Sequence, residues 1–180
     1  MLKILKRVKN ILNKGIMIFA SILTVILVCG ALWQVFSRYV LNDPSVFTEE
    51  LLRFLLIWVA FLGTTYAFGS NEHLAITFVK NKLRGKKKKS LQIFIDASIV
   101  FFAALILVKG GYSITISTLN QSSPILQIPM GYIYAILPVS GVLIIFYQII
   151  NVFERREEES SIEQAVIAPS SSNLENKKEG

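Results

Sequence analysis

The sequence predicts an all-α membrane protein with four transmembrane helices and both termini in the cytoplasm. Three observations support this fold class. Hydrophobic residues make up 53% of the 180 residues and charged residues only 17%, which is too apolar for a soluble domain of this size. The apolar residues are concentrated in four long runs. The basic residues lie mainly before the first run and between the second and third runs.

The four apolar runs cover residues 16–36, 51–68, 91–108 and 131–153. A helix of about 18 residues is roughly 27 Å long, close to the roughly 30 Å hydrocarbon core of a bilayer. Lipid offers no hydrogen-bond partners to the backbone, so spanning helices are expected rather than strands. We expect one membrane domain over 16–153, preceded by a basic cytoplasmic segment at 1–15 and followed by a disordered cytoplasmic tail at 154–180.

The first run follows a basic segment, which is also the order found in signal peptides. The five cations of this segment are Lys3, Lys6, Arg7, Lys9 and Lys14. A signal peptide is disfavoured because the run exceeds the roughly 7 to 15 residues of an h-region and no small-residue cleavage site follows. Cys29 is the only cysteine, which excludes an internal disulfide and a multi-thiolate metal site. We interpret it as an apolar helix residue.

The distribution of cations predicts the orientation. Seven lie between the second and third runs: Lys80, Lys82, Arg84 and Lys86–Lys89. The other two loops hold one each, Arg38 and Lys109. By the positive-inside rule, loops 37–50 and 109–130 face outward. The basic loop has no aromatic side chains to stack on bases, so it indicates a topogenic signal or contact with anionic lipid, and no nucleic-acid partner is expected.

The second run opens with FTEELLRFLLIWVAFLG, residues 47–63, where charges precede an apolar helix. A helical wheel places three charged and four small residues on one broad face: Glu49, Glu50, Arg53, Ala60, Gly63, Thr64 and Ala67. In lipid, small residues mark where helices approach closely, so this face is a candidate subunit interface. The acids also suit the positive end of the helix dipole, which alone explains them but does not explain the arginine.

The first run carries a matching polar stripe that includes Gln34 and ends at Arg38. Arg38 would then lie at the same outer boundary as the charges that open the second run. We hypothesise an outer cluster of Arg38, Glu49, Glu50 and Arg53 that fixes how the first two helices pack, with its outward parts left for a partner.

Few other polar residues interrupt the runs. Asp96, about six residues into the third run, is the best candidate for a buried functional carboxylate; alternatively, it is an interfacial acid facing Lys82 or Lys89. His73 is the only histidine, which excludes bis-histidine haem ligation and a His-rich metal site. It indicates a turn or polar contact at the cytoplasmic interface. Pro138 is expected to bend the fourth helix.

The sequence shows no nucleophile beside a base, no phosphate-binding glycine loop and no paired acids at mid-membrane. We therefore expect no enzyme, and no cofactor or metal in this chain. A transporter that works alone needs a substrate site near the midplane, usually built from broken helices and inverted repeats. The chain offers little of that kind, which favours an accessory role.

The stretch WQVFSRYVLNDPSVFTEELLRFLLIWVAFLGTTYAFGSNEHLAI, Trp33–Ile76, resembles the central signature of the DctQ-like small permease of tripartite ATP-independent periplasmic (TRAP) transporters. The shared features are Arg38–Asn42, the acidic pair with Arg53, Trp58, Gly63 and His73. LQIPMGYIYAILPVSG, Leu126–Gly141, is similar to the family's entry into its last helix. Phe47 departs from the tryptophan that the family commonly has before the acidic pair. The resemblance covers about residues 15–153.

The resemblance implies an accessory role in a three-part transporter of the bacterial inner membrane. A binding protein outside the membrane captures an organic acid, a large membrane subunit carries the sodium and substrate sites, and the small subunit scaffolds the large one. The implied partners are therefore the large subunit, the extracytoplasmic binding protein and the lipid bilayer. Two alternatives stay open: an autonomous four-helix transporter working as a homodimer, with Asp96 as its carboxylate, or a structural membrane protein unrelated to transport. The substrate is not encoded in any residue pattern of this chain.

Overall fold

The computed structural model describes residues 2–70 and 86–154. His73, most of the basic loop and the tail from 155 lie outside these residues. The described part is helical apart from two short loops, and its only β-type pairing is an isolated bridge between Ser122 and Pro129. Four of its helices are long and apolar enough to cross a membrane. The predicted all-α membrane fold class is confirmed.

Helix α1 spans Leu2–Tyr39, a length of 38 residues. This is about 57 Å, nearly twice the hydrocarbon core. The predicted start of the first helix at residue 16 is therefore corrected: from Leu2 onward the basic segment 1–15 forms the first turns of α1. Hydropathy marks where the apolar run begins and not where the helix begins, because lysine and arginine are good helix formers.

Helix α2 spans Val46–Gly69, so it starts five residues before the predicted position 51. The turn between α1 and α2 contains Asn42 at φ 51°, a left-handed conformation that asparagine tolerates. At the helix start, the hydroxyl groups of Ser45 and Thr48 lie 2.7 Å apart. Glu49 in the first turn suits the positive end of the helix dipole. The charged residues thus belong to the helix itself.

The third span is built from three consecutive helical segments: α4 (Lys86–Phe102), the π-helix η1 (Ala103–Gly110) and α5 (Gly111–Thr118). The predicted end at 108 and the predicted outward loop at 109–130 are corrected, because the helix continues to Thr118 and the loop covers 119–129. Gly111, just inside this continuation, allows close packing against the fourth span. A Cβ on Gly111 would lie only 2.8 Å from Leu137 Cβ. Lys109 is therefore inside the span and not at its end.

The fourth span, Met130–Glu154, consists of α6 (Met130–Tyr134), a turn at Ala135 and a helix over 136–154. The interruption lies three residues before Pro138, whose ring clashes with the preceding turn and which lacks an N–H group. Pro138 was expected to bend the fourth helix, and the helix is interrupted at Ala135, one turn before it. This span is the central one: 44% of its apolar stretch is buried, against 11% for each of the other three.

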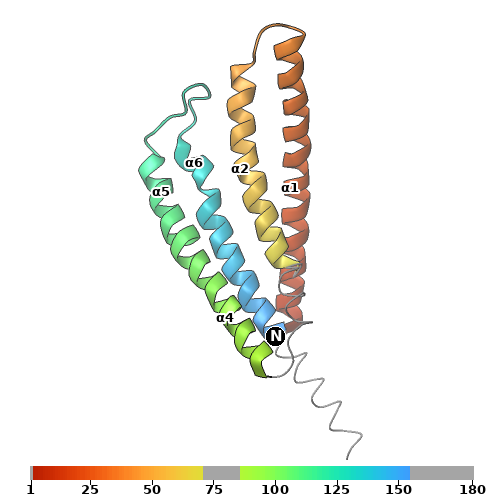
Figure 1. Ribbon diagram of the computed structural model, residues 1–180, viewed down its shortest axis with the longest axis vertical. Helices are drawn as coiled ribbons and strands as arrows, with labels where there is room; N and C mark the ends of the chain where they lie inside the picture. The colour runs from red at the N-terminus through yellow and green to blue at the C-terminus, as the bar shows by residue number, and fades with distance from the viewer. Residues whose placement is uncertain (1, 71–85, 155–180) are drawn as a thin grey trace, which may run out of the picture.

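The four spans form two hairpins (Figure 1). Helices α1 and α2 run side by side, and the third span runs beside α6 and its continuation. The hairpins diverge from the end where the N-terminus lies towards the loops at 40–45 and 119–129 (Figure 1), and the 119–129 loop still contacts Glu50 near the start of α2. Lys9 and Glu154 are in contact, so both ends of the described chain lie at the same end of the bundle. We refer to this as the terminal end and to the opposite one as the loop end.

Candidate subunit interface

At the loop end, Glu49 and Arg53 form an ion pair one helical turn apart on α2. Arg53 Nη2 lies 3.3 Å from Glu49 Oε1, and the two side chains are 69% and 57% exposed. Exposed i,i+4 pairs of this type contribute only about 0.3–0.5 kcal/mol. The pair is therefore a polar surface feature that a partner can contact and not a contact that holds this chain together.

Glu50, the neighbour of this pair, turns the other way. Its side chain is only 7% exposed, and Oε2 accepts hydrogen bonds from the backbone N–H groups of Leu126 at 2.8 Å and Ile125 at 3.2 Å. Hydrogen bonds to a carboxylate are stronger than neutral ones. Glu50 thus ties the start of α2 in the first hairpin to the 119–129 loop of the second hairpin.

Arg38 does not join these residues, so the predicted four-residue cluster is corrected. Its guanidinium lies 5.9 Å from the ring centre of Tyr39, and within the described part of the chain it forms no ion pair. The backbone N–H groups of Ile125 and Leu126 satisfy the Glu50 carboxylate, so this carboxylate does not need a buried cation as a partner. The cluster therefore divides into an exposed Glu49–Arg53 pair and a buried Glu50 contact.

The small-residue face of α2 has few contacts inside this chain. Ala60, Gly63 and Thr64 are exposed and Ala67 is half-buried. A Cβ added to Gly63 would meet no atom within 4 Å. The Thr64 hydroxyl donates to the Ala60 carbonyl at 2.9 Å, so its polar atom is satisfied within the helix. This face is smooth, free of unmet hydrogen bonds and open for contact.

The close helix contacts of this chain involve other glycines. Five of them would bring an added Cβ within 3.0 Å of a neighbouring segment: Gly30, Gly69, Gly111, Gly131 and Gly141. Small residues allow such approaches between membrane helices. The stripe containing Gly63 is therefore a different kind of surface, with small residues but no helix from the described ranges packed on it.

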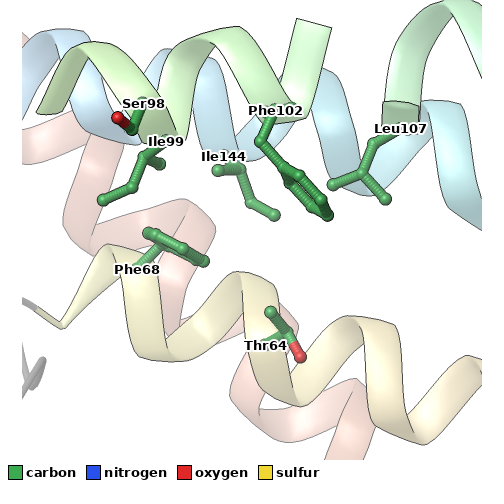
Figure 2. Close-up of a pocket in the computed structure, with 8 residues that line it drawn as sticks. Thr64, Phe68, Ser98, Ile99, Phe102, Leu107 and Ile144 are labelled. Atoms are coloured by element: carbon green, nitrogen blue, oxygen red, sulfur yellow. The ribbon is translucent and has the colours of Figure 1, made fainter. Parts of the chain in front are cut away.

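An apolar groove of about 340 Å³ lies between α2 and the second hairpin (Figure 2). Thr64 and Phe68 line it from α2, while Ile99 and Phe102 line it from α4 and Ile144 from the fourth span. The Phe102 ring points into the space opposite Thr64 (Figure 2). One edge of the small-residue face thus borders a gap between the hairpins.

The terminal end holds a buried polar cluster that the sequence did not reveal. Lys9 Nζ donates to Asn151 Oδ1 at 2.7 Å and to Glu154 Oε2 at 2.8 Å, and Asn151 donates to the Phe68 carbonyl at 3.0 Å. Lys9 and Asn151 are 6% and 3% exposed. Asn13 Oδ1 is buried beside Gly69 at the end of α2, without a partner among the described atoms. The cluster joins α1, the end of α2 and the fourth span.

The remaining predicted site residues lie apart from one another. Asp96 accepts a hydrogen bond from Gln148 Nε2 at 2.7 Å, which links the third and fourth spans. Gln34 is half-buried on α1, and His73 lies outside the described residues. No group of three or more His, Cys, Asp or Glu side chains within the described ranges is close enough to hold a metal ion. Asp96 thus belongs to a contact between two spans and not to a metal site of the described residues.

A family model described as the DctQ component of tripartite ATP-independent periplasmic transporters matches residues 27–158. The match covers more than two thirds of the 180 residues. The chain belongs to the DctQ family. The resemblance predicted from Trp33–Ile76 is thereby confirmed, and this DctQ chain is a multi-pass integral membrane protein.

Known proteins similar to this DctQ chain include two small permease proteins, most of whose length it matches, and one much longer permease. A putative TRAP transporter small permease protein of Haemophilus influenzae is 28% identical over 140 residues, 78% of this chain and 86% of that protein. The sialic acid TRAP transporter small permease protein SiaQ of Vibrio cholerae is 30% identical over 149 residues, 83% of this chain and 86% of SiaQ. The sialic acid TRAP transporter permease protein SiaT of H. influenzae is 31% identical over 117 residues, 63% of this chain but 18% of SiaT. A DctQ-like sequence therefore also occurs within a much longer permease.

The DctQ match takes in all of α2, Asp96 and the fourth span, but it begins after the first 26 residues. The Glu50 contact and the small-residue face of α2 thus lie in the part of the chain shared with the family. Lys9 and the basic end of α1 lie before the matched range.

Proposed function

We propose that this DctQ chain is an accessory subunit that scaffolds the large membrane subunit of a TRAP transporter. The large subunit would bind sodium and take up an organic acid delivered by an extracytoplasmic binding protein. The small subunit would catalyse no reaction and hold no cofactor. The observation that carries this proposal is the small-residue face of α2, which is exposed in this chain although small residues are the ones that let membrane helices approach closely.

The shape and chemistry of this face support a protein partner. Ala60 and Gly63 follow the bulky residue Leu56, which is 58% exposed, on the same side of α2, and their small side chains leave the helix backbone accessible there. A helix of another subunit gains van der Waals contact by packing against such a surface, whereas hydrophobicity alone does not distinguish a partner helix from lipid. The exposed Glu49–Arg53 pair at one end adds a polar contact that can fix the depth of the partner helix.

The SiaT relationship also supports contact with a large permease. There, a stretch similar to this chain is part of a protein named as a permease, of which it covers 18%. Fusion keeps two membrane parts in one chain, which is consistent with their working side by side. The sialic acid in the names of SiaQ and SiaT supports an organic acid as the class of substrate.

The proposed location is the bacterial cytoplasmic membrane, with both termini in the cytoplasm. The terminal end carries Lys6, Arg7 and Lys14 on α1 and the start of α4 at Lys86, whereas the 119–129 loop has no charged residue. This asymmetry supports a cytoplasmic terminal end by the positive-inside rule. The Glu49–Arg53 pair and the 119–129 loop would then face the binding protein.

The test is copurification with the cognate large subunit after coexpression. Ala60→Leu places three extra carbons on the small-residue face, and overpacking of a close contact costs about 1–3 kcal/mol. Ala97→Leu makes the same change on an exposed site of α4 and is the matched control. We expect Ala60→Leu to weaken copurification and Ala97→Leu to leave it unchanged.

Two outcomes would oppose the proposal. Equal copurification of wild type and Ala60→Leu would remove α2 as the interface. Sodium-driven uptake by this chain alone in liposomes would show an autonomous transporter and overturn the accessory role.

A further inference from the structure

The basic end of α1 extends beyond the apolar part of the helix. The apolar run 16–36 is about 31 Å long, which matches the hydrocarbon core. Lys14 therefore lies at the edge of that core, and Arg7 lies about 10 Å further along the axis. A headgroup layer is about 5 to 8 Å thick in each leaflet. The two positions thus bracket the headgroup layer at the terminal end.

Three exposed cations of this segment have no acidic partner among the described residues. Lys6, Arg7 and Lys14 are exposed, and among the described residues none of them is in an ion pair. Helix α1 contains no Asp or Glu along its 38 residues. Lys9 is the exception, since it is buried and paired with Glu154 at 2.8 Å.

The pairing of Lys9 fixes which way the other cations point. Lys9 and Arg7 are two positions apart, about 200° around a helix, so they lie on opposite sides. With Lys9 held against the fourth span, Arg7 and Lys14 share the outward face at i and i+7. Ile11 and Ile18 complete this face at i+4 and i+11 and are 66% and 48% exposed. Cations therefore alternate with apolar side chains on a surface turned away from the bundle; we call it the basic face.

We propose that the basic face of α1 binds the headgroups of anionic phospholipids. The cations would contact the phosphate and acidic headgroup, while Ile11 and Ile18 contact the glycerol and upper acyl region. Charge complementarity carries the assignment: a juxtamembrane cation attracts anionic lipid, with about a fivefold gain in affinity per residue. The proposal concerns this chain alone and does not depend on the large subunit.

Other occupants fit the basic face less well. Nucleic acid is disfavoured because residues 2–18 contain no aromatic side chain to stack on a base. A free phosphate ion would use the cations but would gain nothing from the alternating isoleucines. A phospholipid offers an anionic headgroup to the cations and an apolar part to the isoleucines, of which Ile18 lies within the apolar run 16–36.

The test is native mass spectrometry of the purified full chain in non-ionic detergent, titrated with dioleoyl-phosphatidylglycerol or dioleoyl-phosphatidylcholine. The double variant Arg7→Gln/Lys14→Gln removes one arginine and one lysine from the basic face. The matched control Arg38→Gln/Lys109→Gln removes the same two residue types from exposed sites elsewhere. The charge-preserving variant Arg7→Lys/Lys14→Arg tests for rescue.

We expect phosphatidylglycerol to bind more tightly than phosphatidylcholine, and this preference to weaken as salt is raised. The basic-face variant should lose up to about 30-fold in phosphatidylglycerol affinity, with the control within about twofold of wild type and the charge-preserving variant restored. An equal loss in the control would show a general charge effect and overturn the proposal. Displacement of the lipid by inorganic phosphate alone, or tighter binding of a short RNA at the same salt, would overturn it as well.

Discussion

Removal of the Glu50 carboxylate should open the contact between the two hairpins at the loop end. In Glu50→Ala, the N–H groups of Ile125 and Leu126 lose an acceptor that now lies 3.2 and 2.8 Å away. A hydrogen bond to a charged group contributes about 1.5–3 kcal/mol. Both hydrogen bonds share one carboxylate oxygen, and Ile125 is itself exposed. Water can therefore hydrogen-bond to the freed N–H groups and offset part of the lost energy. We expect a net cost of about 2–3 kcal/mol.

Glu49→Ala is the matched control because it removes the same side chain one position earlier. Its ion pair with Arg53 is exposed on both sides, so the expected cost is only about 0.3–0.5 kcal/mol. Glu50→Gln keeps a side-chain oxygen that can accept the same N–H groups but loses the charge. It should lie between the two alanine variants.

Hydrogen exchange resolved to the amides of Ile125 and Leu126 measures the effect locally. A cost of 2–3 kcal/mol corresponds to about 30- to 150-fold faster exchange through opening of the loop. Glu49→Ala should change these rates by about twofold. Equal exchange in the two alanine variants would refute the role of Glu50, whatever their effects on overall stability.

Three further changes test other contacts by thermal unfolding in detergent. Lys9→Met leaves Glu154 without its cation and should cost about 2–3 kcal/mol, less than for a fully buried pair; an unchanged midpoint would contradict the pairing. Gly141→Ala should destabilise the chain by about 1–3 kcal/mol through overpacking. Its control, Gly63→Ala, should be neutral or slightly stabilising because its site is open. Similar losses of stability in both variants would contradict the packing described. Trp58→Phe removes the indole bond to the Ile133 carbonyl and should cost about 0.5–1.5 kcal/mol; full stability would show that bond to be dispensable.

The four spans were predictable because lipid reduces the problem to one of length and hydropathy. The helix ends were not. At Lys14 the apolar run stops, but the helix does not, since helix propensity and solvation are separate properties. At Lys109 the apolar run stops at a charge, yet the helix continues, and Gly111 packs closely against Leu137. The π-helical segment Ala103–Gly110 is as apolar as the helices around it and has no hydropathy signature of its own.

The partners of the charged residues were less predictable than their positions. Arg38 and Glu50 were placed together because both lie near one short turn. The structure instead gives Glu50 two backbone groups some 75 residues away in sequence, and no local pattern reports a contact of that separation. Lys9 was counted only as one of five basic residues, although its partner Asn151 is a polar residue near the end of an apolar helix. A polar residue in that position is the signal that could have indicated a partner.

The separation between Lys9 and its partners has a consequence for biogenesis. Asn151 and Glu154 follow Lys9 by 142 and 145 positions, so they leave the ribosome only after the other three spans have been made. Until then Lys9 has neither its amide nor its carboxylate partner, and the first hairpin has nothing to dock against at that end. The polar cluster can therefore form only after the fourth span has been synthesised, which places its formation late in the folding of the membrane domain.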